Sequence, residues 1–372
     1  MNIGFDAKRA YHNARGLGNY SRDTVRILSE YYPENQYMLF NPKRVNNSLF
    51  LLQKNMKEIP PEEWFWKTFP SLWRSKGICS QIKKEKIDIY HGLSQELPIG
   101  IEKTNVKSVV TVHDAIFLRY PEFYSASYRY IFTKKNQYAC KVTDKIIAIS
   151  NQTKNDFIEF FGIEENKITV IYQGCNFIFR KPVSESEKEK VRQKYSLPSH
   201  FLLNVGAIEE RKNAALIVEA MHCSHLSIPL VIIGNPTDYK QKIIETARQF
   251  HLSSQVFFLH NVQTNDLPAI YSQAEIFIYP SLFEGFGIPV LEALCCKVPV
   301  ITSKGNCLEE AGGPSSLYID PHNAEELGAA IERVLFDADF KKQMISSGYA
   351  HAENFTDDKI AHQLMTAYRS LF

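Results

Sequence analysis

The feature that most constrains the fold is a strand, a loop, a helix and a second strand within residues 276–302. Residues 276–279 are apolar and end at Pro280, and residues 298–302 form a second apolar run that is typical of a buried strand. Between them, Pro289 opens an apolar helical stretch, where its missing N–H is not needed. This βαβ pattern predicts a parallel sheet whose loop lies at the carboxyl edge, where such sheets bind ligands.

The loop at this edge contains two glycines and is bracketed by two glutamates. Gly285 and Gly287, on either side of Phe286, allow the backbone to approach an anion at the N-terminus of the helix. The carboxylates of Glu284 and Glu292 each accept two hydrogen bonds, which suits neighbouring hydroxyls of a sugar or a ribose. Each glutamate also fits a plainer role, Glu292 as a charge near the positive end of its helix and Glu284 as a solvated loop residue.

Similar apolar strands, each followed by a helical pattern, recur along the chain of 372 residues, which is long enough for two α/β domains. The polar and charged residues 181–200 predict a linker. We therefore expect an N-terminal domain in residues 1–180, a C-terminal domain in residues 201–354 and a final helix in residues 355–372. The other expected strands are residues 1–5, 37–40, 87–90, 108–112, 145–150, 167–172, 201–205, 229–233 and 256–259.

Charged or polar side chains follow two of these strands. Arg211 and Lys212 come shortly after strand 201–205 and before a helix, where a guanidinium fork and an ammonium can contact phosphate. A solvated turn is the alternative for this pair. His113 follows strand 108–112, again at the binding edge of a sheet, although a lone histidine is more often a structural residue.

Near the N-terminus, Gly16 and Gly18 lie in a turn-rich connection after the first strand, and we expect a helix from Asn19 to about Tyr31. The pair lacks the third glycine of a dinucleotide-binding fingerprint, and no acidic residue follows a second strand at the required place. The pattern argues against an NAD-dependent enzyme.

Charge and aromatic residues are unevenly distributed. Residues 1–180 contain 26 Lys and Arg against 18 Asp and Glu, which fits an anionic acceptor or surface and equally fits ordinary variation. Residues 60–76 contain all three tryptophans close to several lysines. That stretch fits a peripheral contact with an anionic membrane surface, and it also fits the core packing of a helix.

The sequence lacks several other signals. No apolar run reaches the roughly 18–20 residues of a membrane span, and no signal peptide is visible, so we expect a cytoplasmic protein. The seven cysteines show no metal-binding spacing. Asp337 and Asp339 form an Asp-x-Asp pair at the start of a charged helix, which indicates N-terminal charge rather than a metal site. We expect no metal, no cofactor and no nucleic-acid partner.

The string from Glu284 through GFG and IPVL to Glu292 resembles the signature of retaining glycosyltransferase family four, whose members have the GT-B fold. VTVHD at residues 110–114, followed by RYPE at residues 119–122, is similar to mannosyltransferase-like members of bacterial surface-polysaccharide pathways. The resemblance implies an α/β protein with two Rossmann-like domains facing each other across a cleft. It also implies a C-terminal helix that crosses back to the N-terminal domain.

The same resemblance implies roles for individual residues. Arg211 and Lys212 would contact the diphosphate of the donor, Glu284 the hydroxyls of its sugar, and Glu292 its ribose. His113 would lie beside the sugar at the reacting carbon. The remaining donor-binding positions implied are Gly16, Gly18, Gly234, Val262, Gly285, Phe286 and Gly287.

The function implied is retaining, metal-independent transfer of a hexose, with mannose favoured, from a nucleotide-sugar to a hydroxyl of a glycan or lipid-linked glycan. GDP-mannose is the favoured donor and a UDP-sugar the alternative. Two rival functions stay open. A GT-B sugar-nucleotide epimerase would need further acid–base carboxylates in its cleft, and none are evident in the sequence. A catalytically silent, scaffold-like relative would not need the charged residues and His113 that this chain retains.

Overall fold

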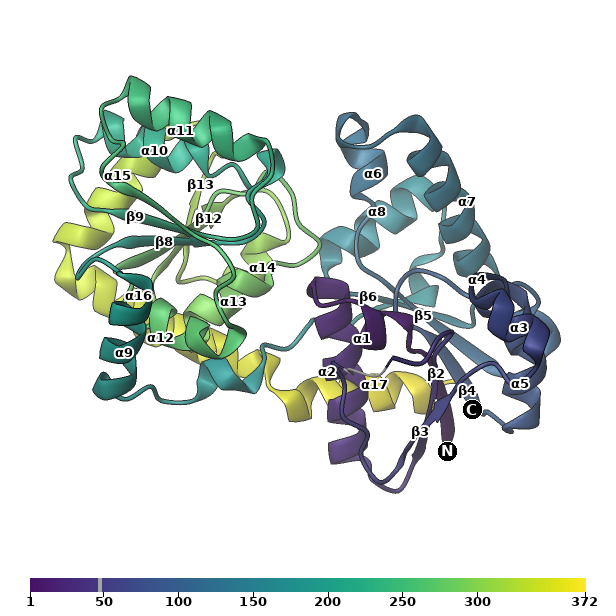
Figure 1. The fold of residues 1–372 in the computed structure, drawn as a ribbon. Coiled ribbons are helices and arrows are strands. Elements are labelled where there is room, and N and C mark those ends of the chain that lie inside the picture. The colour runs from purple at the N-terminus through teal and green to yellow at the C-terminus, as the bar shows by residue number, and fades with distance from the viewer. Residues whose placement is uncertain (46–48) are drawn as a thin grey trace. The chain divides into compact units, whose positions relative to one another are not determined.

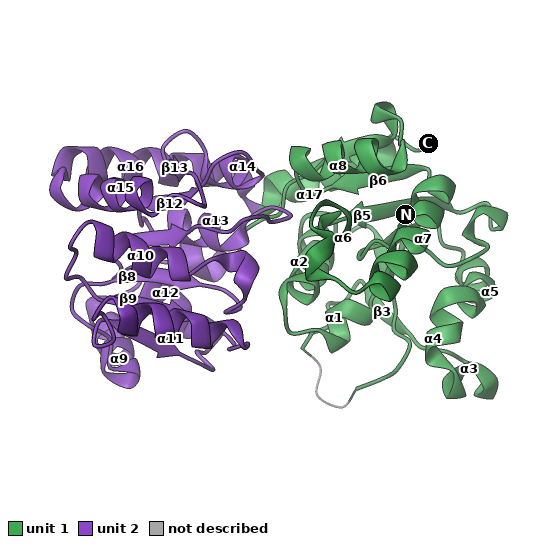
Figure 2. Cartoon of the chain, turned by 90° about the horizontal axis from the view of Figure 1, so that it is seen from above, with its two compact units in different colours: residues 1–174, 357–372 green, residues 175–356 purple. Residues whose placement is uncertain are grey.

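The computed structural model describes residues 1–45 and 49–372, and the chain forms two compact units (Figures 1 and 2). Unit 1 consists of Met1–Gly174 and Asp357–Phe372, and unit 2 of Cys175–Thr356. Each unit is a parallel sheet with helices on its faces, as the recurring strand and helix pattern predicts.

In the described part of unit 1, the sheet has seven strands in the order β3-β2-β1-β4-β5-β6-β7. All neighbouring strands are parallel, so their carboxyl ends share one edge. The strands are β1 (Asn2–Asp6), β2 (Gln36–Phe40), β3 (Met56–Ile59), β4 (Ile89–Gly92), β5 (Lys107–Val112), β6 (Lys145–Ala148) and β7 (Ile168–Val170).

Different helices cover the two faces of this sheet. Side chains alternate along a strand, so Val109 of β5 packs in one core and Val110 in the other. The first core includes α2 and α17, and the second includes α5, α7 and α8. The helices of unit 1 are α1 (Lys8–His12), α2 (Gly16–Tyr31), α3 (Trp64–Thr68), α4 (Pro70–Leu72), the π-helix η1 (Trp73–Gly77), α5 (Ile78–Lys84), α6 (Ile116–Arg119), α7 (Ala126–Val142), α8 (Asn151–Phe161) and α17 (Asp357–Arg369).

The last helix, α17, belongs to unit 1 although unit 2 precedes it in the chain (Figure 1). It packs against α2, with Leu364 and Tyr368 in the same core as Leu28. At its start, Asp357 accepts a hydrogen bond from Arg26 of α2 at 2.8 Å. The helix therefore both extends the core of unit 1 and is fixed to it by an ion pair.

In unit 2, the sheet has six strands within the described residues, again all parallel, in the order β10-β9-β8-β11-β12-β13. Its strands are β8 (Leu202–Val205), β9 (Leu230–Ile233), β10 (Val256–Leu259), β11 (Ile276–Tyr279), β12 (Val300–Ser303) and β13 (Leu317–Ile319). Its helices are α9 (Glu185–Tyr195), α10 (Ala215–Cys223), α11 (Tyr239–Gln249), α12 (Leu267–Tyr271), α13 (Ile288–Cys295), α14 (Leu308–Gly312), α15 (Ala324–Phe336) and α16 (Ala338–Ala352).

The structure differs from the expected domain boundary. Residues 181–200 were expected to be a linker, but they contain α9, which packs against α12 of unit 2. Ser184 starts α9 with a capping box, and Val191 is buried. The polar composition misled the prediction because α9 buries only a narrow apolar stripe and exposes charged residues elsewhere.

Three local expectations are also corrected. Gly16 and Gly18 were placed in a loop before the helix, whereas α2 begins at Gly16 and includes both. Strand β3 was not expected, because its sequence, MKEI, is short and half polar. The tryptophans divide between the two interpretations: Trp73 is buried, while Trp64 is 78% exposed on α3.

Two further observations concern Asp337 and the hydropathy of the helices. Asp337 accepts a hydrogen bond from the backbone N–H of Phe340 and caps α16, which agrees with its interpretation as N-terminal charge. Among the described residues, no helix combines the length and the hydropathy that a membrane span requires.

Candidate functional site

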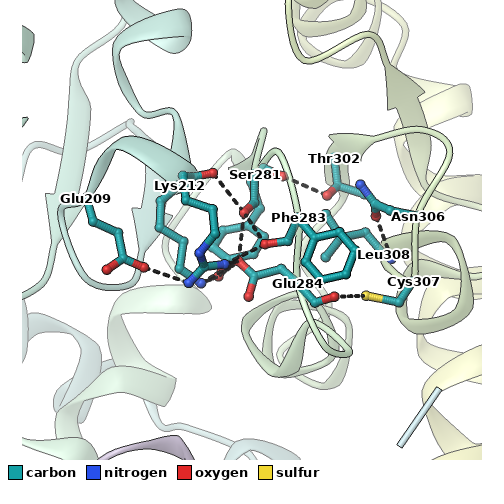
Figure 3. A network of polar contacts seen from close by, with 11 residues as sticks. Glu209, Lys212, Ser281, Phe283, Glu284, Thr302, Asn306, Cys307 and Leu308 are labelled. Atoms are coloured by element: carbon teal, nitrogen blue, oxygen red, sulfur yellow. Dashed lines mark hydrogen bonds and ion pairs between the residues drawn. The ribbon is translucent and has the colours of Figure 1, made fainter. Parts of the chain in front are cut away.

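The strongest cluster of charged side chains in unit 2 lies at the carboxyl edge of its sheet (Figure 3). Arg211 and Lys212 belong to a short 3-10 helix after β8, and Glu284 lies in the loop after β11, the neighbouring strand. Arg211 Nη1 is 2.9 Å from Glu284 Oε1, and Lys212 Nζ forms an ion pair with the same oxygen. Adjacent parallel strands thus bring together residues that are 72 positions apart.

Two hydroxyls complete the contacts of Glu284. Tyr279 donates to Glu284 Oε1 at 3.0 Å and Ser281 donates to it at 2.7 Å. Burial alone raises the pKa of Glu284, but the positive charges of Lys212 and Arg211 outweigh burial and lower the pKa to about 2. Glu284 is therefore ionised at neutral pH, and its interpretation as a solvated loop charge is wrong.

Backbone contacts fix this cluster. Arg211 donates to the carbonyl of Phe283 at 2.5 Å, and the Leu282 N–H donates to the carbonyl of Arg211 at 2.8 Å. Arg211 Nη2 also pairs with Glu209 Oε1 at 2.6 Å. Burial alone lowers the pKa of Arg211, but the charges of Glu284 and Glu209 raise it above its usual value. The guanidinium is permanently charged and joins the loop after β8 to the loop after β11.

Sequence reasoning missed the two hydroxyls. Tyr279 was assigned only to the apolar strand and Ser281 only to the loop, yet Lys212 also donates to the Tyr279 hydroxyl. Tyr279 is 1% exposed, so its hydroxyl needs a polar partner inside the protein. A tyrosine at the last position of a buried strand, next to a charged loop, is the sequence signal that could have identified it.

The loop that contains Gly285 and Gly287 leads into α13. Gly287 has a φ of +112° and caps α13, and a Cβ there would lie 2.6 Å from Leu308 Cδ2. Phe286 is buried, and its ring centroid is 5.6 Å from that of Phe355. The side chain of Phe286 is therefore part of the core of unit 2. The donor-binding roles of Gly285, Phe286 and Gly287 stay predictions.

Glu292 has a different environment on α13. Tyr271 donates a hydrogen bond to Glu292 Oε2 at 3.0 Å. Burial raises the pKa of Glu292 to about 8, and the Tyr271 hydroxyl opposes that shift only in part. Because Glu292 is in the second turn of α13 and is mostly protonated at neutral pH, a helix-end charge does not explain it.

The expected base-site positions lie on the same edge of the unit 2 sheet. Gly234 follows β9 and Val262 follows β10. A Cβ on Gly234 would lie 1.7 Å from the carbonyl oxygen of Gly206, so only glycine fits. His260 donates from Nδ1 to the carbonyl of Gly234 at 2.7 Å, and Lys240 Nζ is 3.0 Å from Nε2 of His260. The roles of Gly234 and Val262 stay predictions.

The remaining expected residues lie in unit 1. His113 follows β5, and its Nε2–H donates to the carbonyl of Leu93 at 2.8 Å. Burial lowers the pKa of His113 to about 4, so the ring is neutral at pH 7 and Nδ1 is its acceptor. The Tyr20 ring packs edge-on against it with centroids 4.7 Å apart.

The two N-terminal glycines have different surroundings in the first turn of α2. A Cβ on Gly18 would lie 1.7 Å from the carbonyl oxygen of Asn13, so close packing explains this glycine. Nothing lies within 4 Å of the corresponding position at Gly16. Only Gly16 therefore presents open backbone of the kind that a ligand can approach.

Comparisons with known proteins give the family. Residues 44–177 match the family model described as Glycosyltransferase Family 4, and residues 186–351 match the model described as Glycosyl transferases group 1. The O-antigen chain mannosyltransferase RfbU of Salmonella typhimurium is 30% identical over 263 residues, which cover 66% of this chain and 69% of that protein. The chain belongs to glycosyltransferase family 4.

One further relative agrees with this membership, and one solved structure shows the fold. The O-antigen chain mannosyltransferase B of Escherichia coli is 28% identical over 291 residues, which cover 76% of this chain and 74% of that protein. The crystal structure of Anabaena Alr3699/HepE in complex with UDP has a TM-score of 0.77 and 18% identity, and the alignment covers 100% of both chains. This family 4 glycosyltransferase thus has the GT-B fold of two Rossmann-like units, and its family activity is hexosyl transfer. In the described residues, no group of three or more His, Cys, Asp or Glu side chains is arranged to hold a metal ion.

Proposed function

We propose that this enzyme transfers a hexose, with mannose favoured, from a nucleotide-sugar to a hydroxyl of a glycan or lipid-linked glycan, with retention and without a metal ion. The observation that carries the proposal is the charged Glu284 between Arg211 and Lys212 at the carboxyl edge of the unit 2 sheet. Mannose and the glycan acceptor are supported by the two similar O-antigen chain mannosyltransferases.

The charged cluster suits a donor that carries both a diphosphate and a sugar. Two cations share a single carboxylate in the structure. Phosphate oxygens compete with Glu284 for Arg211 and Lys212, since both cations bind carboxylate and phosphate alike. As the diphosphate enters, Glu284 is freed to accept hydrogen bonds from the sugar hydroxyls. Glu292, in the second turn of α13, would bind the ribose.

The proposed transfer requires stabilisation of opposite charges. The bond between the anomeric carbon and the diphosphate oxygen breaks, and its electron pair stays on that oxygen. The acceptor hydroxyl oxygen forms the new bond to the same face of the anomeric carbon, and its proton passes to the leaving phosphate. Arg211 and Lys212 stabilise the negative charge that grows on the diphosphate.

His113 is proposed to hold the sugar near the reacting carbon. Its Nε2–H is already used by the carbonyl of Leu93, and its pKa of about 4 leaves Nδ1 unprotonated. A neutral imidazole in this state accepts a hydrogen bond from a sugar hydroxyl and carries no charge that repels the positive ring of the transition state.

The donor can be identified by thermal shift. The structurally similar Anabaena protein was solved with UDP, and the similar relative from Escherichia coli is named a mannosyltransferase. We propose GDP-mannose as the first donor to test. Each of UDP-, GDP-, ADP- and dTDP-hexoses is added to the full chain. A ligand at 100 times its dissociation constant stabilises by about 2.7 kcal/mol, so the true donor stands out. If no nucleotide-sugar raises the melting temperature, the proposal is wrong.

Activity is expected to survive chelation. With the donor identified, EDTA should leave the rate of transfer unchanged, because Arg211 and Lys212 supply the positive charge that a metal would otherwise provide. Loss of activity that manganese or magnesium restores contradicts this expectation. Nucleotide release is measured with and without a glycan acceptor, because an epimerase-like enzyme releases it without acceptor and a silent scaffold does not release it at all.

The proposal extends to location. We infer a cytoplasmic enzyme that contacts the inner face of the cell membrane peripherally. Support comes from Trp64, Phe65 and Phe69, which are 78%, 45% and 50% exposed around α3, next to exposed Lys67. Sedimentation with vesicles tests this. The enzyme should bind vesicles that contain an anionic lipid and should not bind neutral ones, and Trp64→Ser should weaken the binding.

A further inference from the structure

Unit 1 has its own pocket, of about 890 Å³, at the carboxyl edge of its sheet. Residues that follow three adjacent strands line it: Lys8 after β1, Lys43 after β2, and Glu96 after β4. This is also the edge at which His113 follows β5, the neighbour of β4. The pocket thus lies at the edge where open α/β sheets bind ligands, and it is in the unit that does not contain the charged cluster of Glu284.

The acidic groups in this pocket are already paired. Arg74, in the π-helix η1, donates from Nε to both oxygens of Asp6 at 3.1 and 2.9 Å, and its Nη1 contacts Glu96 at 2.6 Å. Lys135 lies 3.2 Å from the other oxygen of Glu96. The formal charges of these four side chains sum to zero.

Three further cations line the pocket without such a partner. Over residues 1–45 and 49–372, no carboxylate lies within 4 Å of the ammonium groups of Lys8, Lys43 or Lys134. Burial and the nearby guanidinium of Arg74 both lower the pKa of Lys8, as expected where positive charge is crowded. A pocket with this surplus of positive charge is complementary to an anion that carries more than one charge.

The other walls of the pocket are apolar. Pro70, Leu97 and Ile99 line it, and Ile99 is half exposed. Phe69 and Leu72, which flank the lining residues of α4, are also exposed. An apolar surface therefore continues from the pocket onto the outside of α3 and α4, which suits a ligand with an apolar chain.

A second, smaller pocket of about 460 Å³ shares Lys43 with the first and adds Arg44 and Lys67. Its one acidic lining residue, Glu62, is paired with Lys84 at 2.5 Å. Positive charge thus extends from the first pocket toward α3.

We propose that the larger pocket binds the phosphate-bearing end of a lipid-linked acceptor, with the phosphates against Lys8, Lys43 and Lys134 and the apolar chain against the wall formed by Pro70, Leu97 and Ile99. This inference rests on the proposed glycosyl transfer, narrows its acceptor to the lipid-linked class and gives the pocket that would bind its phosphates. The glycan attached to the phosphate would then extend along the edge toward His113.

Calorimetry with the full chain tests the proposal directly. Dodecyl diphosphate, used below its micelle concentration, is compared with inorganic pyrophosphate and with the neutral dodecyl maltoside. Dodecyl diphosphate should bind at least about tenfold more tightly than pyrophosphate, because the chain buries apolar area, and the maltoside should not bind measurably. Equal affinity for pyrophosphate, or no binding of dodecyl diphosphate, overturns the proposal.

A charge-matched pair of variants locates the binding. Lys43→Glu combined with Lys134→Glu reverses two exposed cations of the pocket. Lys54→Glu combined with Lys141→Glu makes the same change in exposed residues of unit 1 outside it. The pocket variant should bind dodecyl diphosphate at least about tenfold more weakly, and the control within about twofold of wild type. Equal loss in both variants means nonspecific charge attraction and contradicts the proposal.

Nucleotide binding separates this inference from the proposed function. Nucleoside diphosphate should bind the pocket variant as tightly as wild type, since the donor cluster lies in unit 2. If dodecyl diphosphate binds as predicted but no nucleotide-sugar binds, the proposed function fails and the pocket assignment stands. The opposite outcome is also possible: nucleotide-sugars bind and are turned over, but the pocket variant transfers to a lipid-linked acceptor as fast as the control variant. In that case the assignment of the pocket to the acceptor is wrong and the proposed function stands.

Discussion

The loop before α13 and the second turn of α13 each hold a glutamate, and the two glutamates have opposite properties. In the loop, Lys212 and Arg211 overcome burial and lower the pKa of Glu284 to about 2. On the helix, burial raises the pKa of Glu292 to about 8, and the Tyr271 hydroxyl opposes that shift only in part. The chemistry of a carboxylate is thus decided by its neighbours across the sheet rather than by its place in a motif.

These opposite pKa shifts suggest that the two glutamates have different roles. Glu284 is an anion that forms ion pairs with two cations, and in the proposed mechanism the donor diphosphate would replace it at those cations. Glu292 exists mainly as a neutral acid at pH 7 and becomes a better acceptor when a ligand with hydroxyl donors favours its charged form. The first glutamate should therefore matter most for transfer and the second for nucleotide affinity.

The largest effect is expected for Lys212→Ala. Turnover should fall by roughly 10²–10³, the scale for losing one preorganised group that stabilises the developing charge. Lys342→Ala, at an exposed lysine of α16 that pairs with Asp339, is the matched control and should stay within about twofold of wild type. Initial rates at saturating donor measure both. A folded Lys212→Ala variant with the wild-type rate contradicts the role of this lysine.

Glu284→Gln should lower turnover by roughly 10²-fold, because a charged hydrogen bond to the moving sugar contributes about 1.5–3 kcal/mol. Its affinity for free nucleoside diphosphate should equal or exceed that of wild type, since Lys212 and Arg211 no longer have a carboxylate competing for them. Turnover and calorimetry with the nucleotide are compared in the same preparation. A large loss of nucleotide affinity shows that Glu284 does not act on the sugar.

Glu292→Gln should weaken nucleoside diphosphate binding by about tenfold and leave the rate at saturating donor closer to wild type. The effect is smaller than that of Glu284→Gln because the neutral form of Glu292, which glutamine mimics, already predominates at pH 7. Calorimetry in two buffers with different ionisation enthalpies adds a second readout. Nucleotide binding to wild type should release protons at pH 7, and the variant should not show this release.

The smallest effect concerns stability as a function of pH. The pKa of Glu292 is about 8 when folded and 4.5 ordinarily, so the folded state holds a proton that the unfolded chain loses, and stability falls as pH rises from about 4.5 to 8. Glu292→Gln removes this loss of stability. The melting temperature of the variant minus that of wild type should therefore increase from pH 5 to pH 8, by roughly 2–4 °C for each kcal/mol of difference in the free energy of unfolding.

Glu284→Gln is the control for that measurement. The pKa of Glu284 is about 2 when folded and 4.5 ordinarily, so its contribution to stability is lost only as pH falls below 4.5. Its difference from wild type should stay constant between pH 5 and 8. A rising difference for Glu284→Gln, or a flat one for Glu292→Gln, contradicts the opposite pKa shifts.

Much of the fold was predictable because the signals are local. Alternating apolar runs and helical patterns predicted two parallel sheets, and strand ends predicted where Arg211, Lys212, His113 and Glu284 would lie. The same local signals failed at α9, where polar composition concealed a packed helix, and at β3, where the strand is too short and polar to recognise. They also placed the start of α2 too late, because glycine is more typical of loops than of helix first turns.

The sequence by itself determined which residues reach the carboxyl edges of the two sheets, because strand ends follow from periodicity along the chain. Only the tertiary structure decided what those residues do to one another. The pairing of Glu284 with Lys212, the use of Arg74 to neutralise Asp6, and the burial of Glu292 each join or enclose groups far apart in sequence. Charge, burial and pKa depend on distances in space, and the chain fixes those distances only when its sheets are assembled.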